Sequence, residues 1–190
     1  ALRDSVGNLE PGSGLYPDYA APIVRSGVDG VRELVAARWG MPTPPAYLEG
    51  RRVDKGVTNI RNVGSPHWRR WLGAQHRCLV PFNAFSEPGR DDGNYAPVWF
   101  ALDETRPLAC FAGIWTEWTS TRKLAEGEVT IDVFGFLTCP PNAEVAAIHP
   151  KAMPAILTTE AERETWLSAD WGVAKLLQRP LPDGALVRLK

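Results

Sequence analysis

Four apolar runs in the middle of the chain constrain its fold more than any other feature of the sequence. Each run is dense in aromatic and β-branched residues, which are enriched in β-strands, and glycine, proline or aspartate residues separate the runs. In chain order they are CLVPFNAF (78–85), PVWFAL (97–102), PLACFAGIW (107–115) and TIDVFGFLT (130–138). Strands that follow one another without intervening helices favour an antiparallel sheet over a parallel α/β arrangement.

Helices are expected only at the periphery of that sheet. Ser65 followed by Pro66 is typical of a helix start, because proline is well tolerated at the first helical position. Thr159 and Glu162 have the spacing of a capping box, which predicts a second helix. We therefore expect an α+β fold with a curved, barrel-like, mostly antiparallel β-sheet core and peripheral helices. A length of 190 residues suits a single domain over residues 1–190.

The charge is unevenly distributed, although the net charge is only −1. The segment from Arg51 to Arg77 contains seven basic residues and one acid, Asp54, and therefore carries a net charge of +6. Such a patch attracts a polyanion such as nucleic acid. A solvated basic segment whose acidic partners come from elsewhere in the fold would leave the same pattern.

Several classes of protein are disfavoured. No run of apolar residues approaches the roughly 18 that a membrane helix needs. Cys78, Cys110 and Cys139 lie far apart, in or beside apolar runs, which is typical of a reduced cytoplasmic protein rather than of a disulfide scaffold. The sequence contains no C-x-x-C or H-x-x-x-H pair, so we expect no metal and no cofactor. We expect a cytoplasmic monomer that does not contact a membrane.

Two residues are candidates for proton transfer. His149 lies between apolar residues and is followed by Pro150 and Pro154, which would hold its titratable ring in place. Glu87 follows an apolar run, and neighbouring aromatic residues would raise its pKa by desolvation. A histidine buried under a loop and an ordinary loop carboxylate are the alternatives. Glu117, which lies between two tryptophans, is a rival carboxylate.

Polar and aromatic side chains suggest a binding surface. In TNIRN, an extended backbone would direct Asn59 and Arg61 to the same face. The asparagine could then orient a reacting group, and the arginine could grip a phosphate. Trp39 ends a predicted strand and could stack on a base, although core packing is an equally good interpretation. Cys139 is ten residues from His149, so a Cys–His pair is conceivable.

The remaining tryptophans with a clear context are expected in the core, because large aromatic rings bury much apolar surface. They are Trp68, Trp71, Trp99 and Trp166.

Five segments occur together in an order that resembles the SOS-response-associated peptidase (SRAP) family. They are RWGMP, TNIRN, RCLVPFNAFSEP, FAGIW and FLTCPPNAEVAAIHPKAMPAIL. The resemblance spans roughly Tyr16 to Leu167, and its combined pattern is specific although no single segment is. Members of the family are sensors of abasic sites in single-stranded DNA. The resemblance implies a curved β-sheet core with flanking helices.

The resemblance also implies roles for individual residues, and it favours Glu87 over Glu117. The expected catalytic residues are Asn59, Glu87 and His149. The expected DNA-binding residues are Trp39, Arg61, Arg69, Arg70 and Lys151. Of these, Arg61 and Lys151 are expected to contact phosphates. The expected partner is single-stranded DNA with an abasic site.

The family's nucleophile is a cysteine directly after the initiator methionine. Its amine condenses with the aldehyde of the ring-opened sugar, and its thiol then closes a thiazolidine, which gives a stable protein–DNA crosslink. Glu87 would handle protons, His149 would protonate the ring oxygen or stabilise developing charge, and Asn59 would orient the nucleophile. The chain starts at Ala1, so we expect that the N-terminal catalytic segment is absent and that these 190 residues bind DNA without crosslinking it.

Three functions are therefore carried forward. The first is binding of abasic single-stranded DNA, with crosslinking or a lyase-like activity in the complete form, as part of the SOS response to DNA damage and of DNA repair. The second is a thiol peptidase or amidase, a hydrolase with autoprocessing activity. The third is a non-catalytic nucleic-acid-binding module.

Overall fold

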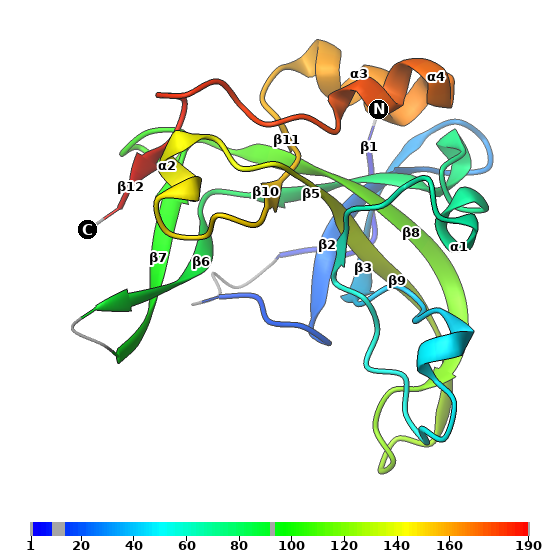
Figure 1. The fold of residues 1–190 in the computed structure, drawn as a ribbon. Helices are drawn as coiled ribbons and strands as arrows, with labels where there is room; N and C mark the ends of the chain where they lie inside the picture. The colour runs from blue at the N-terminus through cyan, green and yellow to red at the C-terminus, as the bar shows by residue number, and fades with distance from the viewer. Residues whose placement is uncertain (1, 9–13, 92–93, 190) are drawn as a thin grey trace.

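The computed structural model of the chain describes residues 2–8, 14–91 and 94–189, and its centre is a closed β-barrel (Figure 1). The ring runs in the spatial order β3–β2–β5–β8–β9, and β9 returns to pair with β3. The β3–β9 pairing is parallel and the other pairings in the ring are antiparallel. The predicted fold, a curved and mostly antiparallel core with peripheral helices, is confirmed.

The helices are short and the strands dominate. The strands are β1 (Leu2–Asp4), β2 (Ala20–Ser26), β3 (Arg32–Trp39), β4 (Asn59–Ile60), β5 (Arg77–Phe82), β6 (Phe85–Asp91), β7 (Asn94–Ala101), β8 (Ala109–Thr121), β9 (Glu128–Cys139), β10 (Met153–Pro154), β11 (Ile156–Leu157) and β12 (Val187–Arg188). The α-helices are α1 (Pro66–Arg69), α2 (Ala143–Ala146), α3 (Glu160–Ser168) and α4 (Trp171–Ala174), and the 3-10 helices are η1 (Pro45–Tyr47), η2 (Ala74–His76) and η3 (Lys175–Leu177). No helix within the described ranges is long and apolar enough to cross a bilayer.

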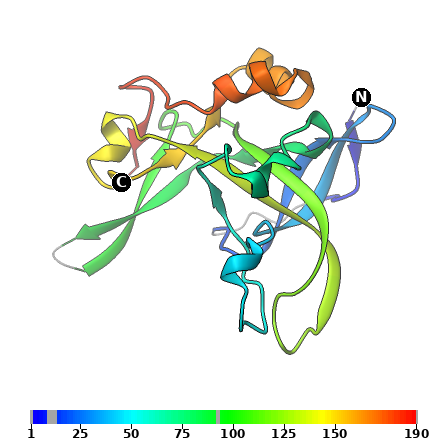
Figure 2. The ribbon, with the colours of Figure 1, turned by 45° about the vertical axis from the view of Figure 1, so that its right-hand side comes forward.

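A second, smaller sheet stands beside the barrel. It has the order β12–β7–β6, and β6 and β7 form an antiparallel hairpin. The hairpin projects from the barrel in both ribbon views, whereas α3 and α4 lie together over another part of the molecule (Figures 1 and 2). The joint between the barrel and this hairpin is where the candidate site forms.

Helix α3 is held against the barrel by one tryptophan. The predicted capping box at its start is present, because the Thr159 side chain accepts from the Glu162 backbone and the Glu162 side chain accepts from the Thr159 backbone. Trp166 is completely buried, and its Nε1 donates to the carbonyl oxygens of Cys78 at 3.0 Å and Gly113 at 3.1 Å. The indole therefore ties the helix to β5 and β8 together.

Two sequence expectations about buried and exposed residues need correction. Trp68, Trp71 and Trp166 are buried as expected, but Trp99 is 36% exposed because its side of β7 faces a cavity. Arg77 was counted in the basic patch, yet it is buried and its guanidinium donates to the Ala169 carbonyl oxygen. The exposed patch therefore contains six basic residues instead of seven, and the only acid of the segment, Asp54, is buried as well.

Trp166→Phe should lower the free energy of unfolding by about 1–3 kcal/mol, because two buried carbonyl oxygens lose their donor while most of the ring volume remains. Trp166→Ala should cost about 3–5 kcal/mol, since it also leaves a cavity. Urea unfolding followed by circular dichroism would measure both changes. Val173→Ala, at an exposed position, is the control and should stay within about 0.5 kcal/mol of the wild type.

Candidate functional site

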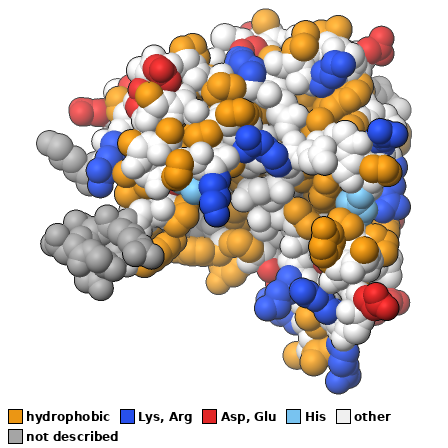
Figure 3. Space-filling view, viewed as in Figure 1, with side chains coloured by type: hydrophobic (Ala, Val, Ile, Leu, Met, Phe, Trp, Pro, Cys, Tyr) orange, Lys and Arg blue, Asp and Glu red, His pale blue; other side chains and the backbone are white. Residues whose placement is uncertain are grey.

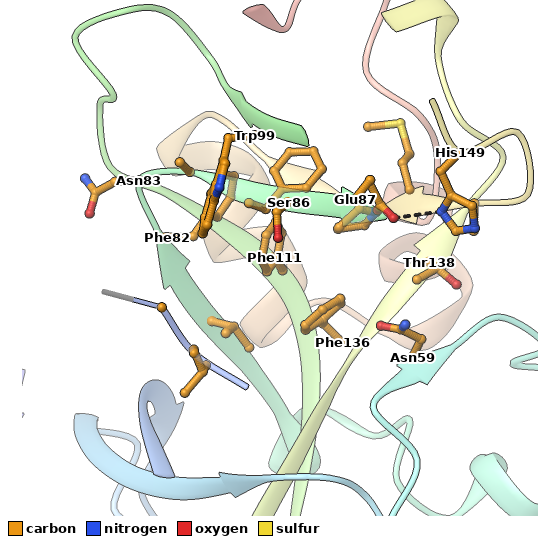
Figure 4. Close-up of a pocket in the computed structure, with 18 of the residues that line it drawn as sticks. Asn59, Phe82, Asn83, Ser86, Glu87, Trp99, Phe111, Phe136, Thr138 and His149 are labelled. Atoms are coloured by element: carbon orange, nitrogen blue, oxygen red, sulfur yellow. Dashed lines mark hydrogen bonds and ion pairs between the residues drawn. The ribbon is translucent and has the colours of Figure 1, made fainter. Parts of the chain in front are cut away.

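A cavity of about 880 Å³ lies between the barrel and the β6–β7 hairpin. Aromatic side chains from three barrel strands form one wall, namely Phe82, Phe111 and Phe136. Polar side chains project into the same space from the hairpin and from neighbouring loops (Figure 4). A volume in this range, apolar walls and a few convergent polar groups are the usual properties of a ligand site.

Glu87 and His149 meet at one end of the cavity although 62 residues separate them. The His149 Nδ1 atom lies 2.7 Å from the Glu87 Oε2 atom, which is a short hydrogen-bond distance (Figure 4). The two side chains are 29% and 12% exposed respectively. A histidine that donates its Nδ1 proton to a carboxylate presents Nε2 as an acceptor.

The ring of His149 is positioned from both sides along the chain. Before it, the short helix α2 is capped by Asn142, whose side chain accepts from the Val145 backbone, and the His149 backbone N–H donates to the Val145 carbonyl at 2.7 Å. After it, Pro154 in β10 pairs with Thr138 of β9. The loop that carries the histidine is therefore fixed at each end by backbone structure.

Burial perturbs the Glu87 carboxyl group. Desolvation raises its pKa above the ordinary value of 4.5, and the neighbouring His149 opposes that rise without cancelling it. Burial disfavours the charged carboxylate, whereas a nearby imidazolium and its hydrogen bond favour it. A carboxyl group with a raised pKa beside a histidine can exchange a proton closer to neutral pH than an ordinary glutamate can.

Asn59 reaches the same end of the cavity from β4 (Figure 4). It is exposed and pairs in parallel register with Phe136 of β9. Its side-chain amide makes no hydrogen bond with any of the described residues, so both its donor and its acceptor face the open space. Trp39 also lines the cavity, and it stacks on Phe136 with ring centroids 5.2 Å apart.

Arg61 and Lys151 are joined beside the cavity. The Nη1 atom of Arg61 donates to the carbonyl oxygens of Lys151 at 2.8 Å and Cys139 at 3.3 Å. Gln178 supports the same corner, because its Nε2 atom donates to the carbonyl oxygens of Arg61 and Thr138. Both basic side chains are exposed, and the arginine also connects β4 to the loop that carries His149.

The other predicted basic residues lie away from the cavity lining. Arg69 and Arg70 are exposed at the end of α1. The Arg70 guanidinium lies over the Trp71 ring at 4.1 Å, a cation–π geometry that holds the side chain in place. Lys and Arg side chains are spread over the face seen in Figure 3, from beside the histidine left of centre to the lower right.

Sequence reasoning missed three residues that line the cavity, Trp99, Thr138 and Arg106. Trp99 resembled a core residue because it lies in an apolar strand. Thr138 ends the fourth apolar run, and only the pairing of β9 with β10 shows that it lies near His149. Arg106 lies in a polar loop, and the sequence contains no signal that this loop borders the cavity.

The competing nucleophile and carboxylate are poorly placed. Glu117 is exposed on β8 opposite Asp132 and does not line the cavity. Cys139 is buried, and burial raises its thiol pKa to about 11, which disfavours a thiolate nucleophile. Within residues 2–8, 14–91 and 94–189, no group of three His, Cys, Asp or Glu side chains could hold a metal ion. Ala1, the first residue, lies outside the described ranges.

Solved structures share the fold. A protein from Bacteroides thetaiotaomicron superimposes with a TM-score of 0.69 at 21% identity, over 91% of this chain and 75% of that one. A protein from Bordetella bronchiseptica gives a TM-score of 0.68 at 23% identity, over 96% of this chain and 90% of that one. At these identities the similarity concerns the fold alone.

Sequence comparison is more informative. Abasic site processing protein YobE of Bacillus subtilis is 30% identical over 135 residues, which are 69% of this chain and 57% of YobE. Abasic site processing protein YoqW is 30% identical over 69% of this chain and 55% of YoqW. The match thus spans little more than half the length of these relatives. The model of the family described as SOS response associated peptidase (SRAP) matches residues 3–188, so the chain belongs to the SRAP family.

Proposed function

We propose that the chain binds DNA at abasic sites and that the cavity receives the base-free sugar. One observation carries the proposal: Glu87 and His149, 2.7 Å apart, share a cavity end with the uncommitted amide of Asn59. Relatives with 30% identity are named abasic site processing proteins, which supports the substrate. A sugar without a base is small and polar, and it suits this polar end.

Single-stranded DNA is the proposed form of the partner, bound by a monomer of a single domain over residues 1–190. A sugar inside a duplex could reach an internal cavity only if the strand were unpaired and turned outward, and a single strand does this at lower cost. Arg61 and Lys151 lie beside the polar end and would contact the phosphates next to the lesion. Trp39 would stack on a neighbouring base, and Arg69 and Arg70 would contact more distant phosphates.

The proposed chemistry starts with the ring-opened sugar, which carries an aldehyde. An N-terminal amine attacks the aldehyde carbon, water leaves and an imine forms. A cysteine thiol on the same residue then adds to the imine carbon and closes a thiazolidine. Glu87 removes a proton from the attacking group and returns one to the departing oxygen, and Asn59 orients the amine. The ring opening that precedes these steps is assisted by His149, whose imidazolium form donates a proton to the ring oxygen of the closed sugar. General acid–base catalysis of this kind contributes about 10²–10⁴-fold.

The covalent step needs an N-terminal cysteine, which residue 1 does not supply because it is alanine. The 190 residues should therefore bind abasic DNA without forming a thiazolidine. A chain with a segment that starts Met-Cys ahead of residue 1 should form a crosslink. In the cell, the proposed role is protection of abasic single strands during the response to DNA damage.

In the chain extended by the segment that starts Met-Cys, Glu87→Gln and His149→Gln should each slow adduct formation by about 10²-fold. The adduct is the denaturation-resistant product with abasic single-stranded DNA. Both variants remove proton transfer but keep side-chain size. The measurement is the rate at which a shifted band appears on a denaturing gel. Glu117→Gln is the matched control, because it changes an exposed carboxylate outside the cavity, and its rate should equal that of the wild type.

Equal rates for all three variants would remove Glu87 and His149 from the chemistry. If binding by the 190-residue chain fell steeply with salt but did not distinguish abasic from intact strands, a non-catalytic module would be the better description. Turnover of a peptide without DNA would support the peptidase alternative.

The carboxyl group of Glu87 should titrate above pH 4.5, because desolvation outweighs the influence of His149. His149→Ala should raise that midpoint further, since the imidazole lowers the pKa of Glu87 through its charge and its hydrogen bond. Carbon-13 NMR of the side-chain carboxyl across a pH series would give both midpoints. Because the folded-state pKa is raised, the contribution of Glu87 to stability is present at low pH and is lost as the pH rises through that pKa. A lower midpoint in His149→Ala would contradict this account.

A further inference from the structure

We infer that the end of the cavity opposite His149 is a nucleotide subsite, in which Trp99 stacks on a base next to the lesion and Arg106 contacts the adjoining phosphate. The inference rests on the proposed function, because it concerns a neighbour of the abasic sugar. It assigns a role to Trp99 and Arg106, whose positions in the cavity are not accounted for by the sequence pattern or by the Glu87–His149 pair.

The cavity has two chemically different ends. In Figure 4, Asn59, Thr138 and His149 lie together at one end, Asn83 lies at the other, and Trp99 stands nearer to Asn83. The polar groups proposed to act on the sugar occupy only the first end. A volume of about 880 Å³ lies in the upper part of the range for small-molecule sites and exceeds what one base-free sugar needs.

Trp99 presents an aromatic surface to this space. It lies on β7 opposite Ser86 of β6, lines the cavity and is 36% exposed, whereas its neighbours Val98 and Phe100 are buried in the core. Its carbonyl oxygen accepts from the Leu189 backbone at 2.9 Å, so the residue is fixed at the centre of the small sheet. An exposed indole on a rigid strand is a suitable platform for a base of any sequence.

Arg106 supplies a positive charge at the same end. Its carbonyl oxygen accepts from the Asn83 side chain at 3.0 Å, which places it beside the residue that marks this end in Figure 4. It lines the cavity, is exposed and forms no ion pair with any residue in the described part of the chain. The nearby Asp103 carboxylate is engaged, because it accepts from both the backbone and the hydroxyl of Thr105.

The backbone of Arg106 is strained. Its φ angle is +54°, a left-handed conformation that is unfavourable for a non-glycine residue, and Pro107 follows it directly, which restricts the backbone further. Asp18 is the other described non-glycine residue with positive φ, and aspartate adopts this conformation more readily. A side chain kept at such a position instead of glycine is a reason to look for function there.

A base and its phosphate fit these two groups better than other ligands do. The indole face attracts a planar ring, and the guanidinium pairs with a phosphate through two donors. Both groups lie in the same cavity as the proposed sugar site, so a strand whose lesion occupies the polar end brings its next nucleotide to this one.

The test uses the 190-residue chain and two short oligonucleotides. One has its abasic site at the 3′ terminus, so that all its nucleotides lie on the 5′ side of the lesion. The other has its abasic site at the 5′ terminus, so that all its nucleotides lie on the 3′ side. Trp99→Leu and Arg106→Asn should each weaken binding to the same one of these oligonucleotides by about tenfold. Binding of either variant to the other oligonucleotide should weaken by less than twofold. Arg106→Asn should also reduce the slope of log affinity against log salt by about 0.7, the value for one phosphate of a single strand.

Stacking has its own readout. With 2-aminopurine next to the abasic site, the wild-type chain should quench its fluorescence, Trp99→Phe should retain part of the quenching, and Trp99→Leu should abolish it. The matched controls are Tyr47→Leu, at an exposed aromatic residue outside the cavity, and Lys175→Asn, at an exposed cation outside it. Asparagine tolerates positive φ, so Arg106→Asn should keep the wild-type Tm, which excludes unfolding as the cause.

Wild-type affinity and full quenching in Trp99→Leu, with no change of salt slope in Arg106→Asn, would overturn the subsite. Equal losses on both oligonucleotides would also overturn it, because a single subsite takes the nucleotide on one side only. Failure of the proposed function is distinguishable: the wild-type chain would then bind intact and abasic strands equally. The quenching and salt-slope assays on intact strands would still decide whether Trp99 and Arg106 contact a nucleotide.

Discussion

One strand edge organises the candidate site. The backbone groups on both edges of β9 need hydrogen-bond partners once the strand is buried, and β8 satisfies only one edge. Three short strands pair one after another with the other edge of β9: β3 pairs at Phe134 of β9, β4 at Phe136 and β10 at Thr138. Three distant parts of the chain are thus placed side by side in the order Trp39, Asn59 and the loop of His149.

Close approach along this edge depends on a small residue between the pairings. At Gly135, a Cβ atom would lie 3.1 Å from the Met41 side chain and 3.2 Å from both the Ile60 side chain and the Thr58 carbonyl oxygen. Contacts that short would require the segment that leads from β3 to β4 to shift by a few tenths of an ångström relative to β9. Asn59 would move with it, so the geometry of the polar end is set by backbone packing as much as by the polar residues themselves.

The fold was easier to predict than the site, for physical reasons. Strand runs carry their own signal in β-branched and aromatic residues, and the capping box at Thr159 is local. The closure of the barrel by parallel pairing of β3 with β9 leaves no local signal. Trp99 lies in an apolar run and Trp166 in a predicted helix, so both are expected in the core, and only the position of the second sheet leaves Trp99 open to a cavity.

For the site residues too, residue identity could be predicted from the sequence, whereas contacts between distant parts of the chain could not. The sequence marked His149 and Glu87 as candidates, but their contact depends on how the hairpin meets the barrel. Arg61 is expected to contact a phosphate, and its Nη1 atom also donates to the carbonyl oxygens of Cys139 and Lys151. Backbone partners of this kind have no signature in the identity of the residues, so side-chain roles that depend on them could not be predicted.

The contrast between two carboxylates explains why the Glu87–His149 pair suits proton transfer. Glu126 accepts from Arg38, and that hydrogen bond lowers its pKa, so it stays ionised at physiological pH. Glu87 has a partner at a similar distance, yet its pKa is raised because burial outweighs the imidazole. A permanently charged partner such as arginine would stabilise the carboxylate at all pH values, whereas histidine can itself change charge. The aromatic wall of the cavity is also rigid, because Phe82 and Phe111 stack with ring centroids 4.0 Å apart, so this wall is part of the folded core and is in place before any ligand arrives.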